Sequence, residues 1–174
     1  MLVTSCGSGP VQLSSDTKHT TVRAEAVTFS YPAGWSITAW DSRSSFTYMV
    51  AAVSNQSLNT PCTHSLNSVS CGPPVDRLDR GAVLIEWWQN AFPTWSFDKQ
   101  PGDPMVVDGL RAKRQDPAEL ASVCPAIGAD SAMQVLVDRN TANYFAFVAC
   151  FRGPNIEAEH AQALAILASA HLKR

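Results

Sequence analysis

The sequence predicts an α+β domain, a mostly antiparallel β-sheet flanked by helices and closed by a C-terminal helix. Three observations predict this class: apolar and polar residues alternate over several short segments, turn signals join neighbouring segments, and helix signals close the chain. Alternation with period two indicates strands, and strands joined by short turns pair antiparallel. A chain of 174 residues is long enough for one domain with a single core.

The first strands are predicted from this alternation. Residues 27–31 alternate until a Tyr-Pro-Ala-Gly-Trp turn, and alternation resumes over residues 35–39. Residues 46–53 are apolar on both sides, so we expect an internal strand there. Residues 82–89 form the next strand and contain Trp87 and Trp88, whose side chains must point to opposite faces of the sheet.

Two hairpins follow. Asp108-Gly109 lies between short apolar segments, which is a strong signal for a two-residue turn. Segments 133–138 and 144–151 are predicted to pair around Arg-Asn-Thr-Ala-Asn, a register that places Cys150 opposite the residues near Ala132.

Helix signals occur at two places. Asp116, Pro117 and Glu119 are typical of a helix start, so we expect a short helix over residues 116–123, ended by Pro125. Asn155 is predicted to cap a helix that continues to about His171.

The composition excludes several functions. Hydrophobic residues make up 45% of the chain, charged residues 16%, and the net charge is −2 with no basic cluster, so nucleic acid is not expected as a partner. No run of about 20 apolar residues is present, so no segment is expected to span a bilayer.

Cys6 lies in Val3-Thr4-Ser5-Cys6, which resembles a bacterial lipobox, where signal cleavage leaves a lipidated cysteine as the first residue. The charged and apolar parts of a signal peptide do not precede it. The Gly-, Ser- and Thr-rich residues that follow are typical of a flexible tether. We therefore expect a lipobox remnant and tether over residues 1–21 and one domain over residues 22–174; the alternative is an ordinary cysteine in a tail.

The other four cysteines, Cys62, Cys71, Cys124 and Cys150, are an even set, which favours two disulfides in an exported protein. Three connectivities are possible. The simplest joins Cys62 to Cys71 around a polar loop, which leaves Cys124 to pair with Cys150. A zinc site is the alternative, but no Cys-x-x-Cys pair is present and Cys62-Thr63-His64 lacks partners at ligand spacing, so no metal is expected.

The segments "VTFSYPAGW", "VVDGLRA" and "YFAFVACFRGPNIEAEHAQALAILASAHL" resemble the PsbP-like fold, named for the extrinsic protein of photosystem II. Small lipid-anchored surface proteins of actinobacteria share this fold. The resemblance implies a sheet sandwiched between helices (an α/β/α sandwich). Its motifs are structural, and no ligand set here matches the manganese-linked roles of the photosynthetic members.

The histidines are the natural catalytic candidates. His19 lies in the tether, and His160 and His171 are too far apart on one helix to share a metal ion. Glu157 and His160 have the spacing of a di-iron motif, but its other ligands are missing. His64 with Asp76 or Asp79 is the one pairing that would suit an envelope hydrolase.

The tryptophans are candidates for binding. Trp40, Trp87, Trp88 and Trp95 could form an exposed aromatic patch, or the tryptophans of the strand could be buried beneath helices. We expect a non-catalytic module without cofactor, anchored to the outer face of the cell membrane through Cys6, that binds a protein or a cell-envelope component. An envelope hydrolase and a carrier of an apolar ligand between sheet and helix are the alternatives.

Overall fold

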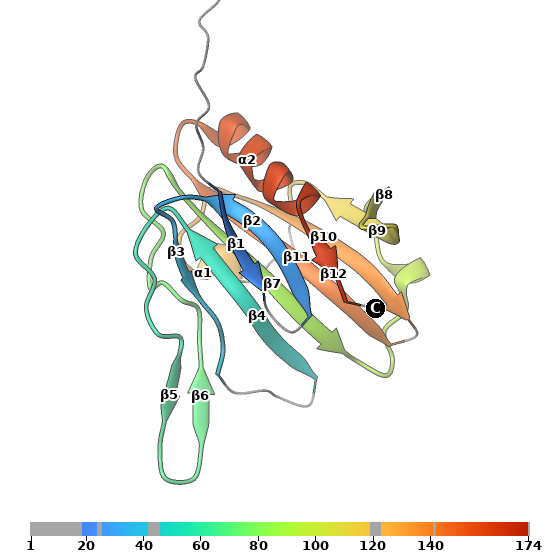
Figure 1. Ribbon diagram of the computed structural model, residues 1–174, viewed down its shortest axis with the longest axis horizontal. Helices are drawn as coiled ribbons and strands as arrows, with labels where there is room; N and C mark the ends of the chain where they lie inside the picture. The colour runs from blue at the N-terminus through green and yellow to red at the C-terminus, as the bar shows by residue number, and fades with distance from the viewer. Residues whose placement is uncertain (1–18, 24–25, 42–45, 119–122, 141, 174) are drawn as a thin grey trace, which may run out of the picture.

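The computed structural model describes residues 19–23, 26–41, 46–118, 123–140 and 142–173 (Figure 1). Strands dominate this part of the chain, and the longest helix lies near its end. The elements are β1 His19–Arg23, β2 Val27–Pro32, β3 Ser36–Thr38, β4 Thr47–Ser54, β5 Cys62–His64, β6 Val69–Cys71, β7 Ala82–Ala91, the 3-10 helix η1 Phe97–Lys99, β8 Asp103–Val107, β9 Leu110–Gln115, α1 Val123–Ala126, β10 Ser131–Asn140, β11 Asn143–Arg152, α2 Ile156–Ala168 and β12 His171–Leu172.

A seven-stranded antiparallel sheet forms the centre of the molecule, in the order β3-β4-β7-β11-β10-β9-β8. A three-stranded sheet, β1-β2-β12, lies over it, and β5 and β6 form a separate two-stranded hairpin. β7 and β11 pair along their full length, from Ala82 opposite Arg152 to Ala91 opposite Asn143. The predicted antiparallel sheet with a C-terminal helix is confirmed.

The first core lies between the large sheet and the layer formed by β1-β2-β12 and α2 (Figure 1). Val83, Ile85 and Trp87 of β7 point into it, because alternate residues of a strand share a face. Phe29 of β2 and Ile166 of α2 pack from the other side. This core holds most of the buried aromatic side chains.

The second core lies on the opposite face of the same sheet. Leu84 of β7 and Cys150 of β11 point into it, and Leu78 from the segment before β7 covers them. Ile127, just after α1, completes this cover. Strands β7 and β11 are therefore buried on both faces, which explains their nearly continuous apolar sequences.

Two hairpins form as the sequence predicts. Asp108 and Gly109 both have positive φ, 49° and 77°, as the two-residue turn between β8 and β9 requires. β10 pairs with β11 in the expected register, with Ala132 opposite Cys150.

The predicted helix start at Asp116 is wrong. Ala118 donates its backbone N–H to the carbonyl of Ala132 at 2.7 Å, so this segment continues along the edge of β10. The Asp116 carboxylate pairs with Arg114 and His160 and is not a helix cap. Glu119 lies outside the described residues. The described helix α1 spans Val123–Ala126 and includes Pro125, which its first turn tolerates.

Two boundaries also differ from the prediction. α2 ends at Ala168, and His171 lies in β12, where it pairs with Thr28 of β2. Residues 19–21, predicted as tether, belong to β1, in which Thr21 pairs with Ser30. No helix among the described residues is long and apolar enough to cross a membrane.

Candidate binding surface

The β5–β6 hairpin projects from the body of the protein (Figure 1). We call residues 59–74, from its base to its tip and back, the hairpin arm. Every residue from Thr63 to Ser70 is exposed, whereas Pro61 and Cys62 at the base are buried. The two strands pair Cys62 with Cys71 and His64 with Val69. The arm therefore has a buried base and a fully accessible outer part.

The tip of the arm is an ordered turn. Ser65 donates its backbone N–H to the carbonyl of Ser68 at 2.8 Å, and the two serine hydroxyls lie 2.7 Å apart. Leu66 lies between them and is fully exposed, and Val69 is also exposed. Exposed apolar side chains on an ordered turn are typical of contact surfaces, because little conformational entropy remains to be lost on binding.

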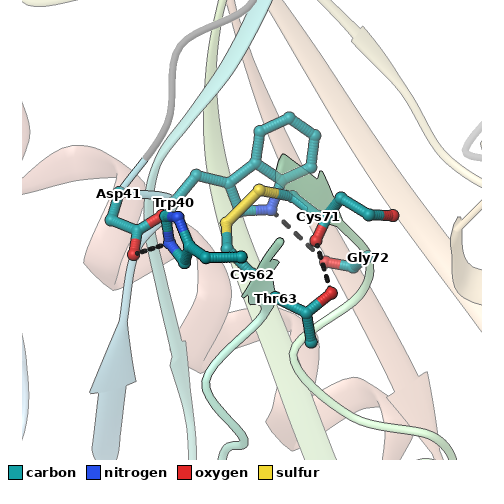
Figure 2. Close-up of a disulfide and its surroundings, with 8 residues drawn as sticks. Trp40, Asp41, Cys62, Thr63, Cys71 and Gly72 are labelled. Atoms are coloured by element: carbon teal, nitrogen blue, oxygen red, sulfur yellow. Dashed lines mark hydrogen bonds and ion pairs between the residues drawn. A yellow bond between two sulfur atoms is a disulfide. The ribbon is translucent and has the colours of Figure 1, made fainter. Parts of the chain in front are cut away.

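A disulfide closes the base of the arm. Cys62 and Cys71 are directly opposite each other with their Cα atoms 4.1 Å apart (Figure 2). Gly72 then donates its N–H to the carbonyl of Pro61 at 2.9 Å. Asn59 donates its N–H to the carbonyl of Pro74 at 2.8 Å. The predicted bridge between Cys62 and Cys71 is confirmed, and it holds together two strands that would be marginal alone.

Two tryptophans attach the arm to the sheet. Trp40 donates its indole N–H to the carbonyl of Gly72 at 3.3 Å (Figure 2). Its ring packs edge-to-face on Trp88 of β7, with ring centroids 4.9 Å apart. Trp88 in turn donates its indole N–H to Glu86 Oε2 at 3.0 Å. The arm is thus connected to the middle of β7 through a column of side chains.

Glu86 is the unusual member of this column. Its side chain is completely buried, and its Oε1 has no hydrogen-bond partner among the described residues. Burial raises the pKa of Glu86 from 4.5 to about 7, and the hydrogen bond from Trp88 opposes this shift. A buried carboxyl group in the middle of a strand could not be predicted from the alternation of β7.

His64 lies on the arm, and its partner is Asp41. The imidazole Nε2 and the Asp41 carboxylate are 2.8 Å apart, and both side chains are about half exposed. Asp76 and Asp79, the partners considered from the sequence, are not the residues that His64 contacts. This half-exposed pair joins the arm to the residue that follows Trp40.

The four tryptophans do not form one patch. Trp87 is completely buried in the first core, where it packs on Phe147, whereas Trp40 and Trp88 are half-buried beside the arm. Trp95 stacks on Tyr144 with centroids 4.1 Å apart. Trp95 belongs to a second aromatic group, which contains Phe46, Phe92, Trp95 and Tyr144 at the end of the sheet where β7 ends and β11 begins.

His160 and His171 each lie beside an aspartate. His160 Nδ1 is 3.2 Å from Asp116 Oδ2, its ring packs on Phe151, and its Nε2 is buried without a partner among the described residues. His171 Nδ1 is 3.3 Å from Asp108 and exposed. Glu157 is exposed in the first turn of α2, and the side chain of His19 is not described.

Cys124 and Cys150 form the second predicted disulfide, which is confirmed. Their Cα atoms are 5.2 Å apart, and both side chains are buried in the second core. The bridge joins α1 to the central strand β11. Cys6 lies outside the described residues.

The chain matches no protein-family model and no curated protein sequence. Sequence reasoning missed Asp41, Leu66 and Glu86. Asp41 could not be linked to His64 because the two are 23 positions apart and meet only through the fold.

Proposed function

We propose that this protein is a non-catalytic, lipid-anchored cell-surface module that binds a protein partner through the tip of the hairpin arm. The observation that carries the proposal is the arm itself: an exposed hairpin, closed by a disulfide at its base and attached to the sheet by Trp40. Such an element is pre-organised, and rigid contact surfaces bind with a smaller entropic cost.

The chemistry of the arm favours a protein over a charged surface. Residues 63–70 read Thr-His-Ser-Leu-Asn-Ser-Val-Ser and contain no Asp, Glu, Lys or Arg. Attraction to phosphate-rich partners depends on clustered positive charge, which the arm lacks. Leu66 and Val69 supply apolar contact area, and the hydroxyl and amide groups around them can form the hydrogen bonds of a protein interface.

The proposed location rests on the cysteines. Two disulfides are typical of proteins that fold in an oxidising compartment, and pairing four cysteines leaves Cys6 as the odd one. The lipobox resemblance around Cys6 then supports an anchor on the outer face of the cell membrane. Changing Cys6 to Ser in the full-length precursor should release its product from the membrane fraction without changing its melting temperature. Membrane association that survives this change would refute the anchor.

The PsbP-like α/β/α sandwich is part of the same proposal. Ala163 and Leu167 of α2 are buried in the first core, and Cys124 of α1 is buried in the second. Helical residues on two faces of one sheet support the sandwich that the sequence resemblance implies. The surface proteins of actinobacteria with this fold are lipid-anchored, which agrees with the proposed role of Cys6.

Photo-crosslinking in the protein's own cells tests the binding proposal. A photoreactive residue replaces Leu66 at the tip of the arm, and matched variants carry it at two other exposed positions, Val106 of β8 and Phe92 of the second aromatic group. We expect a discrete protein adduct from position 66 and none from position 106. An adduct from position 92 alone would show that the partner binds at the second aromatic group and not at the arm. Equal labelling from all three positions would refute a specific interface at the arm.

A cavity supports the carrier alternative as a second candidate. It has a volume of about 430 Å³ and lies between β2 and α2, lined by Ser30, Pro32, Gln162, Ala165, Ile166 and Ser169. Its size and partly apolar lining suit one hydrocarbon chain. If the cavity binds a lipid, native mass spectrometry of protein extracted from membranes should show that lipid bound. Loss of the bound lipid in an Ile166→Trp variant would identify the cavity as its site.

A further inference from the structure

The hairpin arm presents three metal-ligating side chains on one face. Cys62 and His64 are two residues apart in β5 and therefore point to the same side. Cys71 is directly opposite Cys62 in β6, so its side chain shares that side. Thr63 lies between the two β5 ligands and points the other way (Figure 2).

Asp41 brings a fourth donor to the same place from outside the arm. A carboxylate oxygen of Asp41 and the Sγ atoms of Cys62 and Cys71 all lie within 4.8 Å of one another. Asp41 Oδ2 is also 2.8 Å from His64 Nε2. Figure 2 shows Asp41 and the disulfide side by side at the base of the arm. Two sulfur atoms and one carboxylate oxygen thus lie together, and the imidazole of His64 lies against that carboxylate.

We propose that, once the Cys62–Cys71 disulfide is reduced, the arm binds one Zn²⁺ through Cys62, Cys71, His64 and Asp41. The disulfide takes two electrons and two protons from a dithiol, which is oxidised to its own disulfide. Zn²⁺ then displaces the two thiol protons, which pass to solvent, and binds the two thiolates. Thiolate sulfur, imidazole nitrogen and carboxylate oxygen are all zinc ligands, and four such donors complete a tetrahedral site.

The geometry requires only a local adjustment. With Zn–S distances of about 2.3 Å, two thiolates of a tetrahedral site lie about 3.8 Å apart, so the two sulfur atoms must move apart once their bond is reduced. Side-chain rotation at Cys62 and Cys71 can supply this movement. Asp41 and His64 are about half exposed, so the metal can enter from solvent. Zinc would then close the base of the arm in place of the disulfide.

Cobalt binding by the reduced chain tests this site directly. The full chain carries Cys6→Ser to remove the unpaired cysteine, a phosphine reduces it, and Co²⁺ is added as a spectroscopic probe before competition with Zn²⁺. We expect one Co²⁺ per chain with thiolate-to-cobalt absorption in the reduced protein and none in the oxidised protein. Alkylation and mass spectrometry identify which cysteines are reduced.

Variants distinguish metal binding at this four-residue site from metal binding by the free thiols alone. His64→Ala and Asp41→Asn should each weaken Zn²⁺ binding at least about tenfold, the lower range for groups that support a metal site, while Asp76→Asn leaves it unchanged. A reduced Cys62→Ala/Cys71→Ala variant should bind none. Absence of Co²⁺ binding in the reduced parent, or equal affinity of His64→Ala, Asp41→Asn and parent, would overturn the proposal. The result does not depend on partner binding by the arm.

Discussion

The two disulfides of this chain lie in opposite surroundings. Cys124–Cys150 is buried in the second core, where it joins α1 to the central strand β11. Cys62–Cys71 closes a projecting arm whose outer residues, 63–70, are all exposed. The Cys124–Cys150 bridge links two elements of the domain, and the Cys62–Cys71 bridge holds together a hairpin that projects from it.

Chain entropy alone does not separate these two bridges. The cysteines are 26 and 9 positions apart, and loop closure predicts stabilisation of about 4 kcal/mol for the first and about 3 kcal/mol for the second. Burial separates them, because the core bridge also fills space among apolar side chains. The comparison teaches that the same kind of cross-link can join elements within a core at one site and hold an exposed hairpin together at another.

Removing the core bridge should have the largest effect. A Cys124→Ala/Cys150→Ala variant is expected to lose about 4–5 kcal/mol of unfolding free energy, because it loses the cross-link and leaves a cavity beside Leu84. Chemical denaturation measures this loss. Crosslinking from Leu66 should persist in the molecules that remain folded; its disappearance at a temperature where the variant is still folded would mean that the core bridge also controls the arm.

The next largest effect should be the dependence of the free energy of unfolding on pH, which Glu86 produces. Its pKa is raised from 4.5 to about 7, so between these values the folded state holds a proton that the unfolded state releases. The free energy of unfolding therefore falls as the pH rises from about 4.5 through 7, by about 3 kcal/mol in total.

Glu86→Gln should abolish that decline and raise stability at pH 8, because the substituted amide is neutral without binding a proton. Denaturation of the parent and of Glu86→Gln at pH 4.5 and pH 8 measures how strongly the free energy of unfolding of each protein depends on pH. Glu157→Gln, at an exposed carboxyl group of α2, is the matched control and should leave the slope unchanged. A wild-type slope retained in Glu86→Gln would show that Glu86 is ionised in the fold.

Removing the arm bridge should cost less stability. A Cys62→Ala/Cys71→Ala variant is expected to lose about 1–2 kcal/mol, because an exposed hairpin can open locally while both cores stay packed. Hydrogen exchange should rise within residues 61–72 and remain unchanged in β7. A loss as large as that of the core variant would refute the distinction between the two bridges.

The same comparison explains how much the sequence could predict. The pairing of Cys62 with Cys71 followed from local information, because the two cysteines enclose a polar loop, and Cys124 and Cys150 were then the pair that remained. Period-two alternation was enough for the central strands. It also required Trp87 and Trp88 to face opposite ways, although only the packed structure shows that Trp87 is the buried one.

Long-range contacts account for what the sequence missed. The helix predicted from Asp116 failed because Arg114 and His160 contact its carboxylate and the backbone of Ala118 pairs with β10. His64 contacts Asp41, 23 positions away in the chain, and Trp40 contacts Trp88 of β7, so both contacts exist only in the folded chain. Local patterns therefore predicted the strands and the bridge of the arm, whereas the surroundings of the arm depend on tertiary contacts.

The last change, Leu66→Ser, should have the smallest effect on stability and the most direct effect on binding. Leu66 is fully exposed, so its replacement should change the unfolding free energy by less than about 0.5 kcal/mol. Circular dichroism and denaturation curves that overlay those of the parent would confirm that the variant differs only at the tip.

Competition with this variant tests the binding role of the arm most directly. Soluble protein carrying Cys6→Ser is added to cells in which the anchored protein forms its Leu66-position crosslink, either with Leu66 intact or with Leu66→Ser. We predict that the intact competitor suppresses the crosslinked band and that the Leu66→Ser competitor, at the same concentration, leaves it in place. Equal suppression by both competitors would contradict the claim that the tip of the arm binds the partner.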